Sequence, residues 1–358
     1  MDRREFLKRG AAAGLAASAS SAGPFIHAAD KAGTKAPVVG EGEHRYECLH
    51  DFFQAPGSIQ WFETHGVAVD SQGFLYVTHR GGPEKPRSPD EAQDTVAVYD
   101  PEGKFVRSFG KAFHGGGHGI DVRVEDGVEY LYLACMMPVD VLVKTDLKGE
   151  VVWIKEVPKE SRAYDEPGAR FAPTNVAFSP DGGFFLADGY GSHYIHKYDA
   201  DAKWVKTFGG VGEASGKFKT PHGLWLDDRP GRTPALVVAD RANARLQRFT
   251  LDGEHIGEDD HRVSFPAHFD IRGDVLLIPD LHARITLMDG EDRVIAHLGY
   301  DPEWTRQVLE GFEMRKHPDR WPAGKFIHPH DACFDAAGNI LVAEWVATGR
   351  VSFLRRVG

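Results

Sequence analysis

Five histidines stand at the head of short apolar runs that are typical of β-strands: His65, His118, His222, His268 and His330. Neutral imidazole is the commonest protein ligand for zinc and related metals. A metal site that keeps one position open for water or substrate commonly uses three protein ligands. A fold that brings three of these imidazoles to one point would therefore build a catalytic metal site.

The histidine runs belong to an internal repeat. With the run at Thr174 as a sixth member, the heads fall at positions 65, 118, 174, 222, 268 and 330, so the spacings are 53, 56, 48, 46 and 62 residues. A repeat of roughly 40 to 50 residues with about four strands is typical of a β-propeller blade. The sequence thus predicts an all-β fold, a six-bladed β-propeller, in which the first strand of each blade lines the central channel.

The two ends of the repeat region predict how the ring closes. Residues 44–54 form a strand pattern without a blade of its own, and residues 351–357 form the third strand of the last repeat. A propeller ring closes when the N-terminal strand completes the final blade. We therefore expect a propeller domain over residues 44–358, preceded by a linker over residues 30–43. A charged insertion over residues 300–326 separates blades five and six and is long enough to be a lid or a disordered excursion.

The first 29 residues predict export. The run Arg3–Lys8 (RREFLK) matches the twin-arginine pattern, and a weakly apolar stretch leads to an alanine-rich exit near Ala28 and Ala29. We expect a twin-arginine signal peptide over residues 1–29 and a periplasmic or extracellular protein; a basic amphipathic N-terminal helix is the alternative. No other segment has the roughly 18 apolar residues that a membrane span requires.

The composition excludes several classes of partner. A net charge of −11 argues against binding to nucleic acid or to an anionic membrane. The three cysteines Cys48, Cys135 and Cys333 lie far apart, have no zinc-ligand spacing and predict no structural disulfide. We expect a monomer.

Three of the histidines lie in alternate blades. His118, His222 and His330 head the second, fourth and sixth repeats, so a six-bladed ring would arrange them with nearly three-fold symmetry around its axis. This arrangement suits one metal ion. In the alternative interpretation, histidine followed by glycine is a turn-entry feature of the repeat, and the backbone satisfies each imidazole.

These histidine segments resemble those of a known family, the peptidyl-α-hydroxyglycine α-amidating lyases, which form the lyase half of the peptide-amidating enzymes. The similarity covers essentially the whole chain after the signal peptide. The family's zinc histidines begin His-Gly-φ, Pro-His-x-φ and Pro-His-Asp segments, where φ is an apolar residue. These segments match His118-Gly119-Ile120, Pro221-His222-Gly223-Leu224 and Pro329-His330-Asp331.

Two arginines and a tyrosine of the family also have counterparts. The first arginine lies in a His-Arg-Gly step, which is His79-Arg80-Gly81 here. The tyrosine lies in an Asp-Gly-Tyr step, which is Asp188-Gly189-Tyr190. The second arginine lies in an Ala-Asp-Arg step, which is Ala239-Asp240-Arg241.

The resemblance implies a zinc-dependent lyase that cleaves an α-hydroxyglycine-type amide, a carbinolamide, to glyoxylate and an amide or amine. A small carboxylated molecule or a peptide C-terminus would be the substrate. Tyr190 would act as the base, because a phenolate can take the hydroxyl proton. Arg80 or Arg241 would bind the substrate carboxylate, which suits the guanidinium fork.

The resemblance also implies a structural calcium ion. Its ligands would be the carbonyl oxygens of Val67 and Ile120 and the carboxylate of Asp331. Three further histidines, His65, His268 and His328, should lie near the axis, where we expect them to support the ligands or to pack in the core. His328 departs from the family, which has methionine at this position.

Other departures bear on the substrate and on stability. The cysteines that form disulfides in the animal enzymes are absent, with Gly191 after the tyrosine and Arg248 where one cysteine would fall. The chain has no segment similar to the hydroxylating copper domain that makes the lyase substrate. These differences concern the substrate and the stability of the fold more than the lyase chemistry.

Two other functions compete with the lyase. The first is a non-catalytic, secreted NHL-type propeller that binds protein or glycan; such a module has no reason to keep two arginines, a tyrosine and three histidines together. The second is a lactonase-like propeller hydrolase, whose sites consist mainly of carboxylate and asparagine ligands. A propeller fold alone does not decide between these functions. We assign Asn243, Arg245 and Gln247 to a structural feature of the blades, because such residues recur in the blades of six-bladed β-propellers of NHL type, which this chain resembles.

Overall fold

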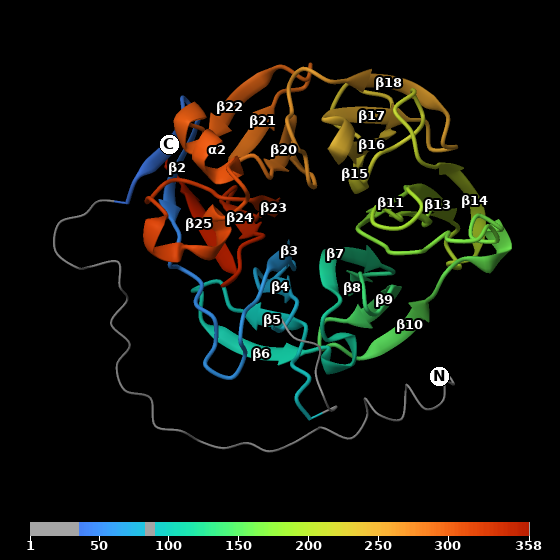
Figure 1. The fold of residues 1–358 in the computed structure, drawn as a ribbon, viewed down its shortest axis with the longest axis horizontal. Coiled ribbons are helices and arrows are strands. Elements are labelled where there is room, and N and C mark those ends of the chain that lie inside the picture. Colours follow the sequence, from blue (N-terminus) through green and yellow to red (C-terminus); the bar gives the residue numbers. More distant parts are fainter. Residues whose placement is uncertain (1–35, 83–89, 358) are drawn as a thin grey trace.

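The computed structural model describes residues 36–82 and 90–357. Over these residues the chain forms six antiparallel β-sheets arranged as a ring around a central axis (Figure 1). This confirms the predicted six-bladed β-propeller. The predicted signal peptide lies outside the described residues.

Blades 1 to 5 each contain four strands that pair in chain order. Blade 1 consists of β3 (Thr64–Val69), β4 (Leu75–His79), β5 (Val96–Tyr99) and β6 (Phe105–Phe109). Blade 2 consists of β7 (Gly117–Glu125), β8 (Val128–Cys135), β9 (Val141–Asp146) and β10 (Val151–Lys155). Blade 3 consists of β11 (Val176–Phe178), β12 (Phe184–Ala187), β13 (Tyr194–Tyr198) and β14 (Trp204–Gly209).

The next two blades follow the same plan. Blade 4 consists of β15 (Pro221–Asp227), β16 (Ala235–Asp240), β17 (Arg245–Phe249) and β18 (His255–Asp259). Blade 5 consists of β19 (Asp270–Arg272), β20 (Val275–Asp280), β21 (Arg284–Met288) and β22 (Val294–Leu298). Some connections between strands contain short 3₁₀ helices, namely η2 (Lys111–Phe113), η3 (Lys159–Ser161) and η4 (Arg241–Asn243).

The sixth blade joins the two ends of the chain. Its inner strands β23 (Pro329–Phe334), β24 (Ile340–Glu344) and β25 (Arg350–Arg356) come from the C-terminal end. Strand β2 (His44–Leu49) pairs antiparallel with β25, from Tyr46 opposite Arg356 to Leu49 opposite Phe353, so the predicted closure is confirmed. A further strand, β1 (Val38–Glu41), pairs with β2 and makes this sheet five-stranded. Part of the stretch predicted as a linker is therefore sheet.

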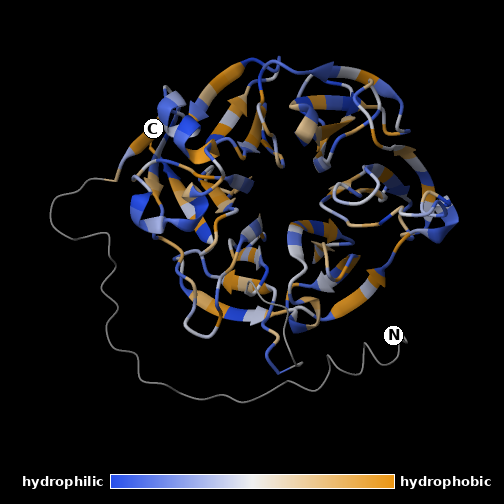
Figure 2. Cartoon of the chain, viewed as in Figure 1, coloured by the Kyte–Doolittle hydropathy of each residue, from blue (hydrophilic) through white to orange (hydrophobic). Residues whose placement is uncertain are grey.

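The apolar core is divided into layers between adjacent blades. Val77 and Tyr99 of blade 1, for example, are buried in one layer with Ala343 and Val351 of blade 6. Most of the hydrophobic colouring lies along the strands of the blades (Figure 2). Each blade thus buries apolar surface against two neighbours, and closure provides the second neighbour for blades 1 and 6.

The insertion between blades 5 and 6 is ordered. It contains α2 (Pro302–Leu309), η5 (Met314–Lys316) and η6 (Pro318–Arg320). Asp301 caps α2 by accepting hydrogen bonds from the backbone amides of Glu303 and Trp304. Trp304, Val308, Met314 and Trp321 pack with Ala283, Ile327 and Val346 of the adjoining blades. Of the two sequence interpretations, the disordered excursion is wrong.

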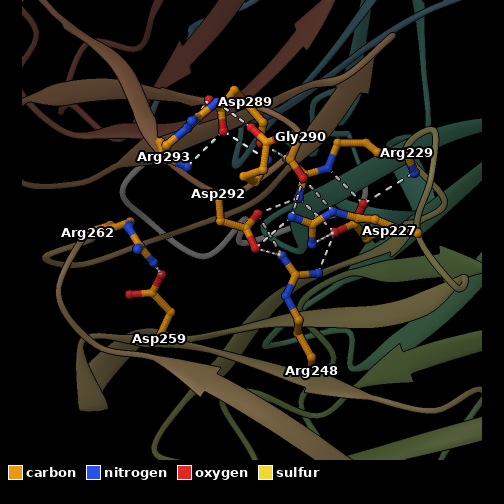
Figure 3. A network of polar contacts seen from close by, with 11 residues as sticks. Asp227, Arg229, Arg248, Asp259, Arg262, Asp289, Gly290, Asp292 and Arg293 are labelled. Carbon is orange, nitrogen blue, oxygen red and sulfur yellow. Dashed lines mark hydrogen bonds and ion pairs between the residues drawn. The ribbon is translucent and has the colours of Figure 1, made fainter.

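A buried network of ions joins blades 4 and 5 (Figure 3). Arg229 binds Asp227 with Nε–Oδ1 2.8 Å and reaches Asp292 of blade 5 with Nη2–Oδ1 2.6 Å. Arg248 binds the same two carboxylates. Arg248 of blade 4 therefore connects neighbouring blades by charge.

No helix within residues 36–82 and 90–357 is long and apolar enough to cross a membrane. Cys48, Cys135 and Cys333 are all free thiols.

Candidate metal centre and active site

The inner strands of four blades change register at their histidine heads. The shifts in the pairing with the second strand fall between Thr64 and Gly66, Gly117 and Gly119, Pro221 and Leu224, and Pro329 and Asp331. Such β-bulges turn a side chain out of the regular alternation and are common beside active sites. The inner strands of blades 3 and 5 start after their heads and pair without a shift.

Glycine follows three of these histidines because the next blade lies too close for a side chain. A Cβ atom at Gly119 would overlap the Asn175 side chain and the Thr174 carbonyl oxygen, and one at Gly66 would meet the His118 carbonyl oxygen. The His-Gly pair therefore serves both purposes: the histidine faces the channel and the glycine permits close packing between blades.

His118, His222 and His330 meet in the channel, as predicted. Their ring centroids are 4.8 Å (His118–His222), 4.8 Å (His118–His330) and 4.6 Å (His222–His330) apart. All three rings are buried. Alternate blades thus deliver their imidazoles to one point.

Each of these imidazoles contacts a backbone carbonyl at the head of the following blade. The Nδ1–oxygen distances are 2.7 Å from His118 to Thr174, 2.7 Å from His222 to Ala267 and 2.9 Å from His330 to His65. A carbonyl only accepts, so Nδ1 carries the proton and Nε2 presents its lone pair. The same arrangement orients metal-binding histidines in proteins generally.

The three Nε2 atoms are left as acceptors. His118 Nε2 and His222 Nε2 are 3.1 Å apart, and His330 Nε2 is buried without a hydrogen-bond partner in the described residues. Burial lowers the pKa of His118 to about 3, and the Arg241 and Arg80 guanidinium groups contribute to the shift. Burial also holds the pKa of His222 and His330 well below the usual value. Neutral imidazoles with converging lone pairs fit a zinc-type cation.

His65 lies in the same cluster but is oriented differently. His65, His118 and His330 have ring nitrogens within 4.8 Å of one another, so this set could also hold a metal ion. His65 Nδ1, however, is buried without a hydrogen-bond partner among the described residues. We favour the set with His222, because each of its three rings is oriented by a carbonyl and His65 Nδ1 is not.

Tyr190 stands directly beside the imidazoles. Its hydroxyl oxygen is 3.0 Å from His222 Nε2, 3.4 Å from His118 Nε2 and 3.1 Å from Arg241 Nη2. Asp188 fixes the loop that carries it by accepting hydrogen bonds from the backbone amides of Ala172 and Ser192, both at 2.6 Å. The predicted base is thus held where it can exchange a proton with a ligand of the histidine cluster.

Two arginines approach the cluster from different blades. Arg241 is buried, and its guanidinium lies over the rings of Tyr190 and Phe265 at 5.3 Å and 5.2 Å. Arg80 is held by Nε, which donates to the Gly115 carbonyl at 3.0 Å, and by Nη1, which donates to Glu63 Oε2 at 3.2 Å. Both guanidinium groups are close enough to lower the pKa of His118, where burial is the largest cause.

The histidine and tyrosine motifs did not indicate two further residues of this region. Glu63 binds both Arg80 and Arg315, and Arg315 belongs to the insertion. Position 63 precedes a histidine head and could have been noticed as an acid beside an apolar run. Nothing in the repeat pattern pointed to Arg315, because insertions do not follow the period.

A group of buried carboxylates lies near Asp331. Asp331 Oδ2 accepts a hydrogen bond from the Val67 amide at 3.0 Å. His268 Nε2 is 3.6 Å from Asp121 Oδ2 and 3.9 Å from Asp331 Oδ1. Burial and, to a smaller extent, nearby Asp121 raise the pKa of Asp331 to about 7. Asp270 has the same shift for the same two reasons.

This group has the donors that a hard cation such as Ca²⁺ prefers. Asp121 Oδ2 and both ring nitrogens of His268 lack hydrogen-bond partners in the described residues. The donor set therefore suits the predicted calcium near Asp331, although the sequence did not single out Asp121 or Asp270. Ligation by the carbonyls of Val67 and Ile120 stays a prediction.

His328 is kept apart from the three ligand candidates. Its ring stacks on Phe312 of the insertion with centroids 5.2 Å apart, and it lies 5.6 Å from the ring of Trp345. Its Nδ1 contacts the Leu281 carbonyl at 2.7 Å. His328 thus packs between the insertion and blade 6.

The fold alone places the chain among six-bladed propellers. A virginiamycin B lyase from Staphylococcus aureus, in complex with quinupristin, superposes with a TM-score of 0.55 at 12% identity and covers 87% of this chain and 100% of that one. A gluconolactonase from Xanthomonas campestris gives 0.56 at 13% identity, over 89% and 94% of the two chains. At such low identity these likenesses show the fold and nothing more.

The comparison of sequences is more specific about the family than the comparison of folds. Peptidyl-alpha-hydroxyglycine alpha-amidating lyase 1 of Drosophila melanogaster is 28% identical over 314 residues, which are 78% of this chain and 54% of that protein. Peptidyl-glycine alpha-amidating monooxygenase of Mus musculus is 26% identical over 253 residues, 63% of this chain and 25% of that protein. The resemblance to the amidating lyases is thereby confirmed. The chain spans between a quarter and about half of these relatives, and no protein-family model matches it.

Proposed function

We propose that this protein is a zinc-dependent lyase that cleaves an α-hydroxyglycine-type amide to glyoxylate and an amide or amine. The observation that carries the proposal is the contact of the Tyr190 hydroxyl with His118, His222 and Arg241 at one point. A base, a set of metal ligands and a cation for an anionic substrate are the groups that this cleavage requires.

In this mechanism the two arginines bind and orient the substrate. The planar carboxylate suits a guanidinium fork, so Arg80 or Arg241 would hold it and direct the carbinol carbon toward Tyr190. Arg241 is the better candidate for a second task, because it already donates a hydrogen bond to the Tyr190 hydroxyl. That task is to position the oxygen that would take the substrate proton.

Tyr190 would take the proton of the substrate hydroxyl. The O–H electron pair then forms the aldehyde C=O bond while the C–N bond breaks, and the departing nitrogen takes up a proton. His118, His222 and His330 would hold the zinc ion, which supplies polarisation of the hydroxyl oxygen and a lower pKa for its proton. The reaction needs no oxidant or reductant.

Three further features belong to the same proposal. Calcium bound at Asp331 would be structural and would tie blade 6 to blade 1, because Asp331 already accepts from Val67. We also propose that the protein acts as a monomer and is exported by the twin-arginine route. Loss of thermal stability on treatment with EGTA, with recovery on adding Ca²⁺, tests the calcium role.

The lyase activity is tested by glyoxylate release from α-hydroxyhippurate. Tyr190→Phe should keep its zinc and its fold but lower kcat by about 10²–10⁴-fold, the usual scale for loss of a general base. His222→Ala should lose zinc and activity together. Zinc-replete wild-type protein that releases no glyoxylate above background would contradict the proposal and favour a binding module.

A further inference from the structure

An ion-pair chain connects the insertion to Arg80. Arg315 Nη2 is 2.6 Å from Glu63 Oε1, and Arg80 Nη1 is 3.2 Å from Glu63 Oε2. The Glu63 side chain is buried and the Arg315 side chain is largely covered, with 9% and 13% exposed, whereas Arg80 is 31% exposed. One carboxylate thus serves two guanidinium groups, and the outer one, Arg80, faces solvent.

Arg315 is fixed on blade 6 by several contacts. Its guanidinium lies 3.6 Å from the centre of the Trp345 ring, and its Nε donates to the Trp345 carbonyl at 3.3 Å. Its own carbonyl accepts from the Ala347 amide at 3.1 Å. A cation–π contact this close, together with backbone bonds, leaves the side chain little freedom. Arg315 is therefore a rigid partner for Glu63.

Glu63 is fixed as well. Its amide donates to the Val346 carbonyl at 3.2 Å, and its backbone has φ = 53°, a left-handed conformation that non-glycine residues seldom adopt. Such a conformation persists where surrounding contacts hold it. The carboxylate is consequently placed from blade 6 and the insertion, although the residue precedes blade 1.

The sharing of Glu63 affects the charge that Arg80 can offer. If Arg315 were absent, both Glu63 oxygens would be available to Arg80 and could neutralise it in a bidentate pair. Because one Glu63 oxygen is bound to Arg315, the carboxylate compensates the charge of Arg80 only in part. Arg80 can therefore still attract another anion. The Gly115 carbonyl fixes its Nε side. Within the described residues, the Arg80 side chain donates through Nε and Nη1, so Nη2 could donate a hydrogen bond to a carboxylate oxygen.

We propose that Arg315 is a positioning residue that acts through Glu63 to hold Arg80 ready for the carboxylate of a small anionic substrate. The insertion, through Arg315, and blade 1, through Arg80, would then form the anion-binding site together. This inference rests on the proposed function and adds a role for residues outside the repeat. It identifies the substrate as a ligand with a carboxylate at the end that meets Arg80.

Binding of hippurate, a carboxylate that lacks the reactive hydroxyl, tests the inference without turnover. Isothermal titration of zinc-replete protein should show weaker binding for Arg315→Met by roughly 10- to 100-fold, the scale of a lost charge-assisted hydrogen bond. Arg306→Met is the matched control, because Arg306 lies in the same insertion but pairs on the surface with Glu303. Its Kd should equal that of the wild type.

A double-mutant cycle separates positioning from general damage. In an Arg80→Ala background, Arg315→Met should cause no further loss, because the residue it positions is gone. Arg315→Gln should weaken hippurate binding in the same direction and provides a second variant if Arg315→Met is unstable. Zinc content and Tm of each variant show whether the fold and the histidine cluster are intact.

Several outcomes would overturn the inference. These are an Arg315→Met Kd within twofold of wild type, an equal loss in the Arg80→Ala background, or wild-type protein that does not bind hippurate. Hippurate binding that depends on Arg80 and Arg315, but without glyoxylate release from α-hydroxyhippurate, would support the inference and contradict the proposed lyase reaction instead.

Discussion

At the scale of single residues, tautomers decide what the histidine cluster can bind. Carbonyl partners at Nδ1 make His118, His222 and His330 acceptors at Nε2. Two acceptors 3.1 Å apart cannot hydrogen-bond to each other. The Tyr190 hydroxyl can donate to only one of the two Nε2 atoms, so the other is free to bind a cation or a proton. Burial, which lowers the pKa of all three imidazoles, disfavours the proton. A metal ion would suit these lone pairs.

Two substitutions distinguish the alternative ligand sets. His222→Asn should lower the zinc content to near zero after dialysis, because it removes one of three carbonyl-oriented ligands. His65→Asn should leave about one zinc per chain, because His65 is not oriented in this way. Metal analysis of both purified proteins provides the measurement. Zinc lost from His65→Asn and retained by His222→Asn would assign the site to His65, His118 and His330.

At the scale of elements, the bulged inner strand of a blade is what positions each histidine of the site. The register shift turns each histidine into the channel, and the glycine after it lets the next blade approach closely enough to supply a carbonyl. His118 and Gly119 illustrate the coupling: Thr174 accepts from His118 Nδ1 and also lies where a Gly119 side chain would stand. Packing between blades and ligand orientation therefore depend on the same backbone.

Gly119→Ala should consequently affect both stability and metal binding. The added methyl group has to displace blade 3 backbone, which costs roughly 1–3 kcal/mol of unfolding free energy as an overpacked core does. Gly257→Ala is the control, since that position in β18 has open space. Thermal unfolding and zinc affinity would be compared for the two variants. Equal unfolding free energies for the two variants would contradict this prediction, because blade 3 could then move away from Gly119 without an energetic cost.

Features of the fold and the site could be predicted from the sequence where they follow the repeat, and could not where they lie outside it. The spacing of the heads predicted the blades and the meeting of His118, His222 and His330, because equivalent positions in a ring converge on the axis. The strand patterns at the two ends predicted the closure. The ion pair of Glu63 with Arg315 joins residues 252 positions apart and lies outside the period, so no pattern could indicate it. Strand β1 was missed because a four-residue edge strand has too little alternation to recognise.

At the scale of the whole molecule, charge as well as apolar packing connects neighbouring blades. Asp227 is buried, yet hydrogen bonds from Arg229 and the charges of Arg248 and Arg229 outweigh burial and hold its pKa well below the usual range. A depressed pKa means that the network stabilises the fold fully above the pKa of an unfolded aspartate, about 3.9. The contribution is lost as pH falls toward the folded-state value.

Asp227→Asn should therefore destabilise the protein most near neutral pH. Removing one partner leaves buried Arg229 without its main counter-charge, which typically costs roughly 3–5 kcal/mol. The difference in Tm between wild type and variant should be large at pH 6–7 and shrink below about pH 4. Asp201→Asn, in a surface pair with Lys203, should have little effect at any pH. A difference for Asp227→Asn that does not change with pH would contradict this account.

Closure between β2 and β25 also sets an order of events during synthesis. The ribosome releases β2 at the start and β25 at the end, so blade 6 cannot be completed until nearly the whole chain has emerged. His330 lies on β23 and appears late, whereas His118 and His222 belong to blades that are already made. A nascent chain consequently lacks the full imidazole set until the ring is about to shut. Metal uptake at this centre would mark a finished molecule.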